Sequence, residues 1–178
     1  MSTDDGLEPD PAPPGADAEA TYFLALSHED AGDADGAEAL FAKAAAAGSA
    51  NAMYSLGLLF EDRGDLLGAQ TWYFRAAEGG NADAMYDLGY TAGERGDTAE
   101  AESWYRRAAA AGHGDAMNNL GLLLDARGDQ AGAESWYRRG ADAGSADAMS
   151  NLSLLLEDKG DLDEAEEWRR HAREIGLV

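Results

Sequence analysis

Residues 49–80 read SANAMYSLGLLFEDRGDLLGAQTWYFRAAEGG, and two amphipathic patterns follow one another within them. In the first half, apolar or small residues recur at spacings i, i+3, i+4 and i+7: Met53, Leu56, Gly57 and Phe60. The same spacing recurs in the second half: Ala69, Trp72, Tyr73 and Ala76. This spacing places side chains on one face of an α-helix. Residues 49–80 therefore predict two helices that pack their apolar faces together.

A short turn is predicted between the two helices, at Gly64-Asp65. Glycine suits the left-handed conformation that ends a helix. Aspartate is a strong N-cap, because its side chain accepts hydrogen bonds from free N–H groups of the next helix. Arg63, on the last turn of the first helix, complements the negative end of that helix.

The tripeptide Arg-Gly-Asp at this turn is familiar as an adhesion motif. It recurs every 32 residues at 63–65, 95–97 and 127–129, with Lys-Gly-Asp at 159–161. Because each of its residues has a structural reason to be there, we interpret it as a helix-turn-helix junction and not as an adhesion site. Glu100 and Glu164 follow their aspartates by three residues, which predicts a capping box at two of the turns.

The whole pattern repeats with a period of 32 residues. Equivalent positions recur through the chain, as at Leu24, Leu56, Leu88, Leu120 and Leu152, and at Trp72, Trp104, Trp136 and Trp168. The repeats are predicted at 17–48, 49–80, 81–112, 113–144 and 145–176, within a repeat domain spanning 17–178. A fixed period of this length indicates one supersecondary unit stacked on itself, which is a solenoid.

The residues before the repeats have a different composition. All four prolines lie within residues 1–16, together with several acids and no basic residue. We expect this segment to be a disordered, acidic, proline-rich tail, because it lacks the apolar content needed to fold.

Charge and composition limit the class of partner. A net charge of −22 argues against nucleic acid and anionic membranes, which would be repelled, and favours a basic or neutral protein partner. A simpler explanation is that the charge keeps an elongated protein soluble. An acidic N-terminus and the lack of a long apolar run predict a cytoplasmic protein, and the excess of arginine over lysine is typical of GC-rich bacterial genomes.

The repeat resembles two related families of helical repeats. Met53-x-x-Leu56-Gly57-x-x-Phe60, followed by Ala69-x-x-x-Tyr73, is similar to the tetratricopeptide pattern. Trp72-Tyr73-x-x-Ala76-Ala77 is similar to the Sel1-like pattern. The repeat is shorter than in either family. The resemblance implies an all-α, right-handed α-solenoid of five helix-turn-helix repeats with ten antiparallel helices. It also implies a non-catalytic scaffold that binds a protein or peptide in a concave groove lined by the first helix of each repeat.

If this geometry holds, a second stripe on the first helices lines the groove. The predicted peptide-binding residues are Tyr22, Tyr54, Leu58, Asp83, Tyr86, Tyr90, Asp115, Asn118 and Leu122. Tyrosine offers a large contact area and a polar tip, and the acids would steer a basic segment inward. The alternative is that the tyrosines and leucines pack one repeat on the next.

The third repeat departs from its neighbours at Ala92 and Gly93, which predicts either a hollow for a partner side chain or neutral drift. The tryptophans are expected in the core, and the polar last repeat is expected to act as a cap. We find no pattern for catalysis, for a cofactor or for a metal ion. Two alternatives stay open: an acidic inhibitor that mimics nucleic acid to mask a basic protein, and a homodimer.

Overall fold

The computed structural model of the chain describes residues 16–176, so the predicted tail lies, apart from Ala16, outside the described residues. Residues 16–176 form ten α-helices and no strand. The helices are α1 (Ala16–Asp30), α2 (Ala34–Ala46), α3 (Ala50–Asp62), α4 (Leu66–Glu78), α5 (Ala82–Glu94), α6 (Thr98–Ala110), α7 (Gly114–Asp125), α8 (Gln130–Asp142), α9 (Ala146–Lys159) and α10 (Leu162–Gly176).

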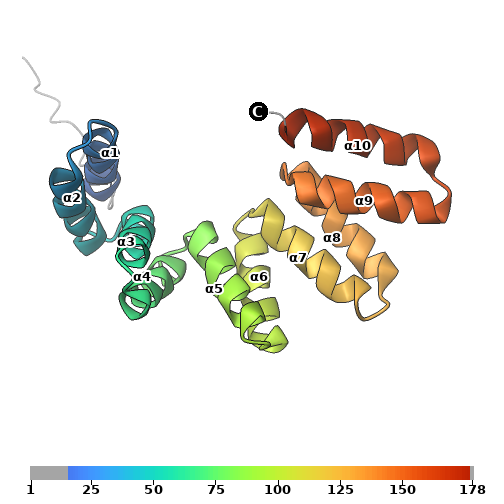
Figure 1. The fold of residues 1–178 in the computed structure, drawn as a ribbon, viewed down its shortest axis with the longest axis horizontal. Helices are drawn as coiled ribbons and strands as arrows, with labels where there is room; N and C mark the ends of the chain where they lie inside the picture. Colours follow the sequence, from blue (N-terminus) through green and yellow to red (C-terminus); the bar gives the residue numbers. More distant parts are fainter. Residues whose placement is uncertain (1–15, 177–178) are drawn as a thin grey trace, which may run out of the picture.

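The helices pair into five hairpins that stack in order along the chain. Each helix packs on the next one in sequence, and the pairs α1–α2, α3–α4, α5–α6, α7–α8 and α9–α10 form the repeats. Figure 1 shows the hairpins following one another around an open arch, with the first and last repeats at its two ends. The predicted all-α solenoid of five repeats is therefore confirmed.

The turns between helices follow the predicted chemistry. Gly64 has a φ of 78°, in the left-handed region, and the N–H of Asp65 donates to the carbonyl of Phe60 at 2.9 Å. The Asp65 side chain then accepts from the N–H of Gly68 at 3.0 Å, which caps α4. The equivalent glycine has positive φ at each of the nine turns within residues 16–176.

The predicted capping boxes are wrong in one of their two hydrogen bonds, the one from the N-cap backbone N–H to the glutamate side chain. Asp97 does cap α6 by accepting from the N–H of Glu100. However, the N–H of Asp97 donates to the carbonyl of Ala92, so it is not free to bond a glutamate side chain. The Glu100 carboxylate instead pairs with Arg95 at 2.8 Å, and the Glu164 carboxylate pairs with Arg138.

The turns between repeats are capped by the residue after the glycine. Ser49, Asn81 and Ser145 each accept a hydrogen bond from the backbone N–H three residues later. His113 has the same function through its Nδ1 atom, which accepts from the N–H of Ala116 at 3.2 Å. We did not predict this cap because histidine is not a usual N-cap residue. Its position in the 32-residue register was the available signal.

The core runs along the inside of the hairpins. Leu56, Leu88, Leu120 and Leu152 are all buried, but the equivalent Leu24 is exposed because no described helix precedes α1 to cover it. The tryptophans were predicted to lie in the core, but they are only half-buried and pack at its edge. Three of them are covered from outside by a guanidinium group, in the pairs Trp72–Arg75, Trp104–Arg107 and Trp136–Arg139.

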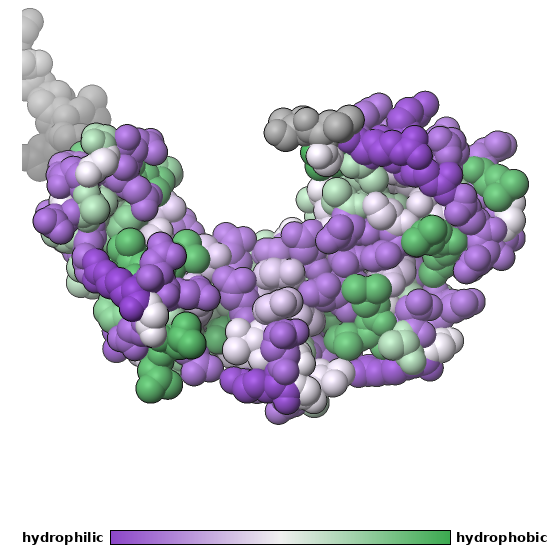
Figure 2. All heavy atoms as spheres, in the orientation of Figure 1, coloured by the Kyte–Doolittle hydropathy of each residue, from purple (hydrophilic) through white to green (hydrophobic). Residues whose placement is uncertain are grey.

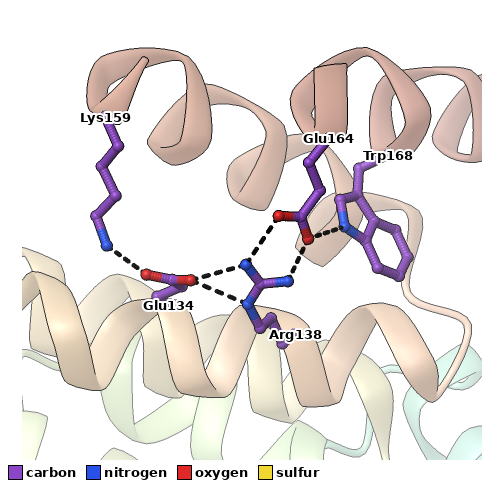
Figure 3. Close-up of polar contacts among 5 residues, drawn as sticks. All are labelled: Glu134, Arg138, Lys159, Glu164 and Trp168. Atoms are coloured by element: carbon purple, nitrogen blue, oxygen red, sulfur yellow. Dashed lines mark hydrogen bonds and ion pairs between the residues drawn. The ribbon is translucent and has the colours of Figure 1, made fainter. Parts of the chain in front are cut away.

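Ion pairs link successive repeats along the second helices. The basic residue of three of the tripeptides reaches a glutamate in the repeat before it, in the pairs Arg63–Glu38, Arg127–Glu102 and Lys159–Glu134. Figure 3 shows the last of these pairs extended by Arg138, which contacts both Glu134 and Glu164. The hydrogen bond from Lys159 and the one from Arg138 together lower the pKa of Glu134. This network holds the polar last repeat onto α8.

The series is interrupted at the second repeat, where Gln70 and Phe74 stand in place of the glutamate and arginine found in later repeats. Arg95 therefore pairs with Glu100 of the next helix instead. Leu66, Leu67 and Phe74 are exposed on this helix, and Figure 2 shows hydrophobic side chains at the surface over α4, at the lower left of the molecule.

Candidate peptide-binding groove

The structure gathers the predicted groove residues into two hollows on the first helices of the repeats. One hollow of 470 Å³ is formed by α1, α3 and α5 and contains Tyr22, Tyr54, Leu58 and Asp83 in its lining. A second hollow of 330 Å³ lies further along, where Tyr90 of α5 and Leu122 of α7 face the same space. The linings of these two hollows do not include Tyr86, Asp115 and Asn118.

Three apolar or aromatic side chains give the groove its accessible contact surface. Leu58 is 43% exposed, Tyr90 is 54% exposed and Leu122 is 44% exposed. They occupy the same position in successive repeats, so the 32-residue register spaces them regularly along the first helices. Each could bury further area against a partner, because each is already half-covered and held by its helix.

The tyrosines at the neighbouring position also contribute to packing between repeats. Tyr54 is partly buried, and its ring is tilted against the ring of Tyr73, with 5.5 Å between centroids. Its hydroxyl donates a hydrogen bond to Asp87 at 3.0 Å. Tyr86 lies flat on the ring of His113, with 4.5 Å between centroids. Burial raises the pKa of both hydroxyls above the ordinary tyrosine value. These rings therefore join α3 to α5 and α5 to α7.

The predicted acidic residues at the edge of the groove also make polar contacts between successive repeats. Asp115 accepts a hydrogen bond from the Ser145 hydroxyl at 2.6 Å, and Asp83 lies 3.4 Å from the ring of His113. In both cases, a residue of one repeat contacts the N-cap residue of the next. Asn118 is buried and accepts from the Asn151 side chain at 2.8 Å. Asp83 and Asp115 remain exposed while making these contacts, and Asp83 also lines the first hollow.

Several lining residues were not predicted from the sequence. Glu29, Ser55 and Asp62 also line the first hollow. Thr98, Asn119 and Leu123 also line the second hollow. Ser55, Asn119 and Leu123 each lie one residue after a predicted position of the stripe. Glu29 and Asp62 lie at the C-terminal ends of first helices, and Thr98 begins the second helix α6. Finding them required the rotation between repeats, which the sequence does not show.

Asp87 is a carboxylate held in an unfavourable setting. It is partly buried behind the groove, and burial raises its pKa above the ordinary value despite the hydrogen bond from Tyr54. A carboxyl whose pKa is higher in the folded state than in the unfolded state destabilises the fold when it is ionised. The penalty is present at neutral pH and disappears as the pH falls through the folded pKa toward about 4.

We expect Asp87→Asn to raise the stability of the protein at neutral pH, since asparagine keeps an acceptor for Tyr54 without the charge. The gain should shrink as the pH is lowered through the folded pKa of the wild-type carboxyl, because protonation removes its charge. Thermal unfolding across this pH range measures it. Asn119 occupies the equivalent position one repeat later, so Asn119→Asp is the reverse control and should destabilise at neutral pH. A gain from Asp87→Asn that does not depend on pH would contradict this explanation.

Within residues 16–176, no cluster of three or more histidine, aspartate or glutamate side chains is arranged to hold a metal ion. None of the helices in that range is both long and apolar enough to cross a membrane.

Comparison with known proteins identifies the family. Models of the tetratricopeptide repeat match residues 22–84, 54–115, 86–148 and 145–176. The chain belongs to the tetratricopeptide repeat family, and its fold is also similar to those of Sel1-like repeat proteins of known structure. No functionally curated protein matches the sequence.

Two solved structures are similar over most of the chain. A Sel1 repeat protein from Oxalobacter formigenes has a TM-score of 0.77 and 26% identity, over 89% of this chain and 73% of the other. The protective antigen c5321 of uropathogenic Escherichia coli, which displays an SLR fold, has a TM-score of 0.74 and 28% identity, over 87% of this chain. This chain spans 38% of the length of c5321. YrrB, a tetratricopeptide protein with an unusual peptide-binding site, shares the fold at a TM-score of 0.50 and 22% identity.

Proposed function

We propose that this protein is a non-catalytic scaffold that binds a basic protein segment along the groove of its first helices. The observation that carries the proposal is the row of half-exposed apolar side chains, Leu58, Tyr90 and Leu122, at one register position of three successive repeats. Membership of a family built from stacked helical repeats supports a binding role, because such arrays present extended surfaces to partners.

The charge around the groove supports a basic partner. Carboxylates line both hollows, with Glu29, Asp62 and Asp83 in the first and Glu94 in the second. No lysine or arginine lines either hollow. With a net charge of −22, the protein would attract a positively charged segment and repel an acidic one. Charge would then select the partner, and the apolar side chains would hold it.

The test uses two pools of fluorescent decapeptides, one enriched in lysine and arginine and one in aspartate and glutamate. We expect the basic pool to bind and to remain bound at about 150 mM salt, where long-range attraction is largely screened. The triple variant Leu58→Ala/Tyr90→Ala/Leu122→Ala should weaken binding by about tenfold or more. Fluorescence anisotropy provides the measurement.

The matched control removes the same kind of side chain from another face. Leu66→Ala/Leu67→Ala/Phe74→Ala deletes three exposed apolar groups from α4, away from the groove, and should leave binding unchanged. An equal loss of peptide binding in both variants would contradict the proposal that the groove is the binding site. If both variants bind the peptides as tightly as the wild type, and binding is lost when the salt concentration is raised, the acidic surface as a whole would instead mimic nucleic acid.

A further inference from the structure

The second hollow exists because one acidic side chain is missing from the third repeat. The position of Gly93 carries an acid in the other four repeats: Glu29, Glu61, Asp125 and Glu157. A Cβ atom placed on Gly93 would meet nothing closer than 4.0 Å, from Ala101 and from the hydroxyl of Tyr105. The space normally taken by the acidic side chain is therefore open in this repeat.

Neighbouring repeats show what this space holds when it is filled. In the second repeat, the hydroxyl of Tyr73 donates a hydrogen bond to the Glu61 carboxylate. In the last repeat, arginine replaces the tyrosine, and the guanidinium of Arg169 pairs with Glu157. The repeat framework thus accommodates either a carboxylate bonded to a phenol or a guanidinium bonded to a carboxylate. In the third repeat, Gly93 stands at the position of Glu61 and has no side chain that could bond to the Tyr105 hydroxyl.

The lining of the 330 Å³ hollow combines apolar walls with hydrogen-bond acceptors. Leu122, Leu123 and Ala101 provide apolar surface, and the rings of Tyr90 and Tyr105 provide aromatic surface. The side chains of Glu94, Asn119 and Thr98 are the polar members of the lining, besides the phenols. This suits a side chain with an aliphatic stem and a terminal donor group that can lie against an aromatic ring.

We propose that this hollow, the Gly93 pocket, receives an arginine side chain of the bound partner. Its stem would lie against Leu122 and Leu123, and its guanidinium would face the Glu94 carboxylate and the Tyr105 ring. The net negative charge of the protein and the Glu94 side chain in the lining disfavour a carboxylate of the partner as the occupant. Guanidinium is favoured over ammonium because it stacks on aromatic rings, as Arg75, Arg107 and Arg139 do on tryptophans of this same chain.

This inference rests on the proposed groove but makes a narrower claim, because it assigns one side-chain type to one repeat. A scaffold could bind basic segments through Leu58, Tyr90 and Leu122 without using the Gly93 pocket. The test therefore uses a probe that can occupy the pocket without spanning the groove.

The probe is N-acetyl-arginine methylamide, titrated into the isotopically labelled full chain while backbone amide shifts are followed by NMR. We expect saturable shifts at Gly93, Asn119 and Leu122. The citrulline analogue, which has the same shape without the charge, should bind about tenfold more weakly. Shifts spread evenly over the acidic surface, equal binding of citrulline, or no saturable shift at these residues would overturn the assignment.

Gly93→Leu is the decisive variant, because it fills the pocket while replacing a helical glycine by a good helix former. It should melt at or above the wild-type temperature and yet bind the arginine probe about tenfold more weakly or worse. Thr91→Leu adds the same side chain to the same helix, and Thr91 is absent from the lining of the pocket, so it is the control and should keep full binding. Glu94→Gln tests the charge separately and should reduce the preference for arginine over citrulline.

The basic decapeptide pool distinguishes failure of the pocket from failure of the groove. If the pool binds the wild type and Gly93→Leu equally, the groove stands and the assigned pocket is wrong. If the pool binds neither protein, both proposals fail. A loss of pool binding in Gly93→Leu, with the control unaffected, supports both.

Discussion

Replacing Leu120 with alanine is expected to destabilise the protein by roughly 2–5 kcal/mol. Leu120 is only 2% exposed and lies in the central core cluster, which also contains Tyr105 and Met117. Alanine would remove buried apolar contacts and leave a cavity that rigid neighbours cannot fill. In a solenoid, each repeat contacts only its neighbours, so the loss should concentrate around the fourth repeat.

The matched control is Leu122→Ala, two residues further along α7. Leu122 is 44% exposed, so its replacement should change stability by no more than about 0.5 kcal/mol. Urea unfolding gives the total change, and amide hydrogen exchange shows which repeats lose protection. Equal effects from the two variants would mean that the 32-residue register does not separate core from groove.

This pair shows how far the sequence predicts the fold. Both residues are leucines on one helix, and the spacing of apolar residues together with the repeat register distinguishes them. The same reasoning misplaces Leu24, because its burial depends on a helix that precedes it and not on its own repeat. Local patterns determine each hairpin, whereas burial at the ends of the array depends on what stacks there.

The groove was harder to predict than the fold. The stripe containing Tyr90 and Leu122 follows from the register, but the contact from Asp115 to Ser145 requires the rotation of one repeat on the next. From the sequence alone, Asp115 is therefore predicted to be an acidic residue at the edge of the groove, and its contact between two repeats is missed. The hollow at Gly93 could be predicted, since comparison among five copies of one unit reveals a missing side chain directly.

Gly121→Ala is expected to destabilise the protein by about 1–2 kcal/mol, although alanine is the better helix former. Gly121 lies in the middle of α7, where the substitution alone would favour the helix by about 1 kcal/mol. A Cβ at this position, however, would lie 2.4 Å from Cε1 of Tyr137. Tyr137 is 2% exposed and enclosed by its core cluster, so its ring has little room to move. So close an approach to an enclosed ring places the overpacking penalty in the upper part of its usual range, at about 2–3 kcal/mol, which exceeds the helical gain.

The same substitution at Gly93 should have the opposite sign. Gly93 also lies within a helix, α5, but a Cβ added there would be 4.0 Å from its nearest neighbouring atoms. Gly93→Ala should thus stabilise the protein by up to about 1 kcal/mol. Urea unfolding of both variants measures the difference, which we expect to be about 2–3 kcal/mol in total. If both variants were stabilised, the Tyr137 ring would have to shift at little cost, and small residues at this position would not be needed for close helix packing. If both were destabilised, the space at Gly93 would not be open, and the pocket proposed there would lose its structural basis.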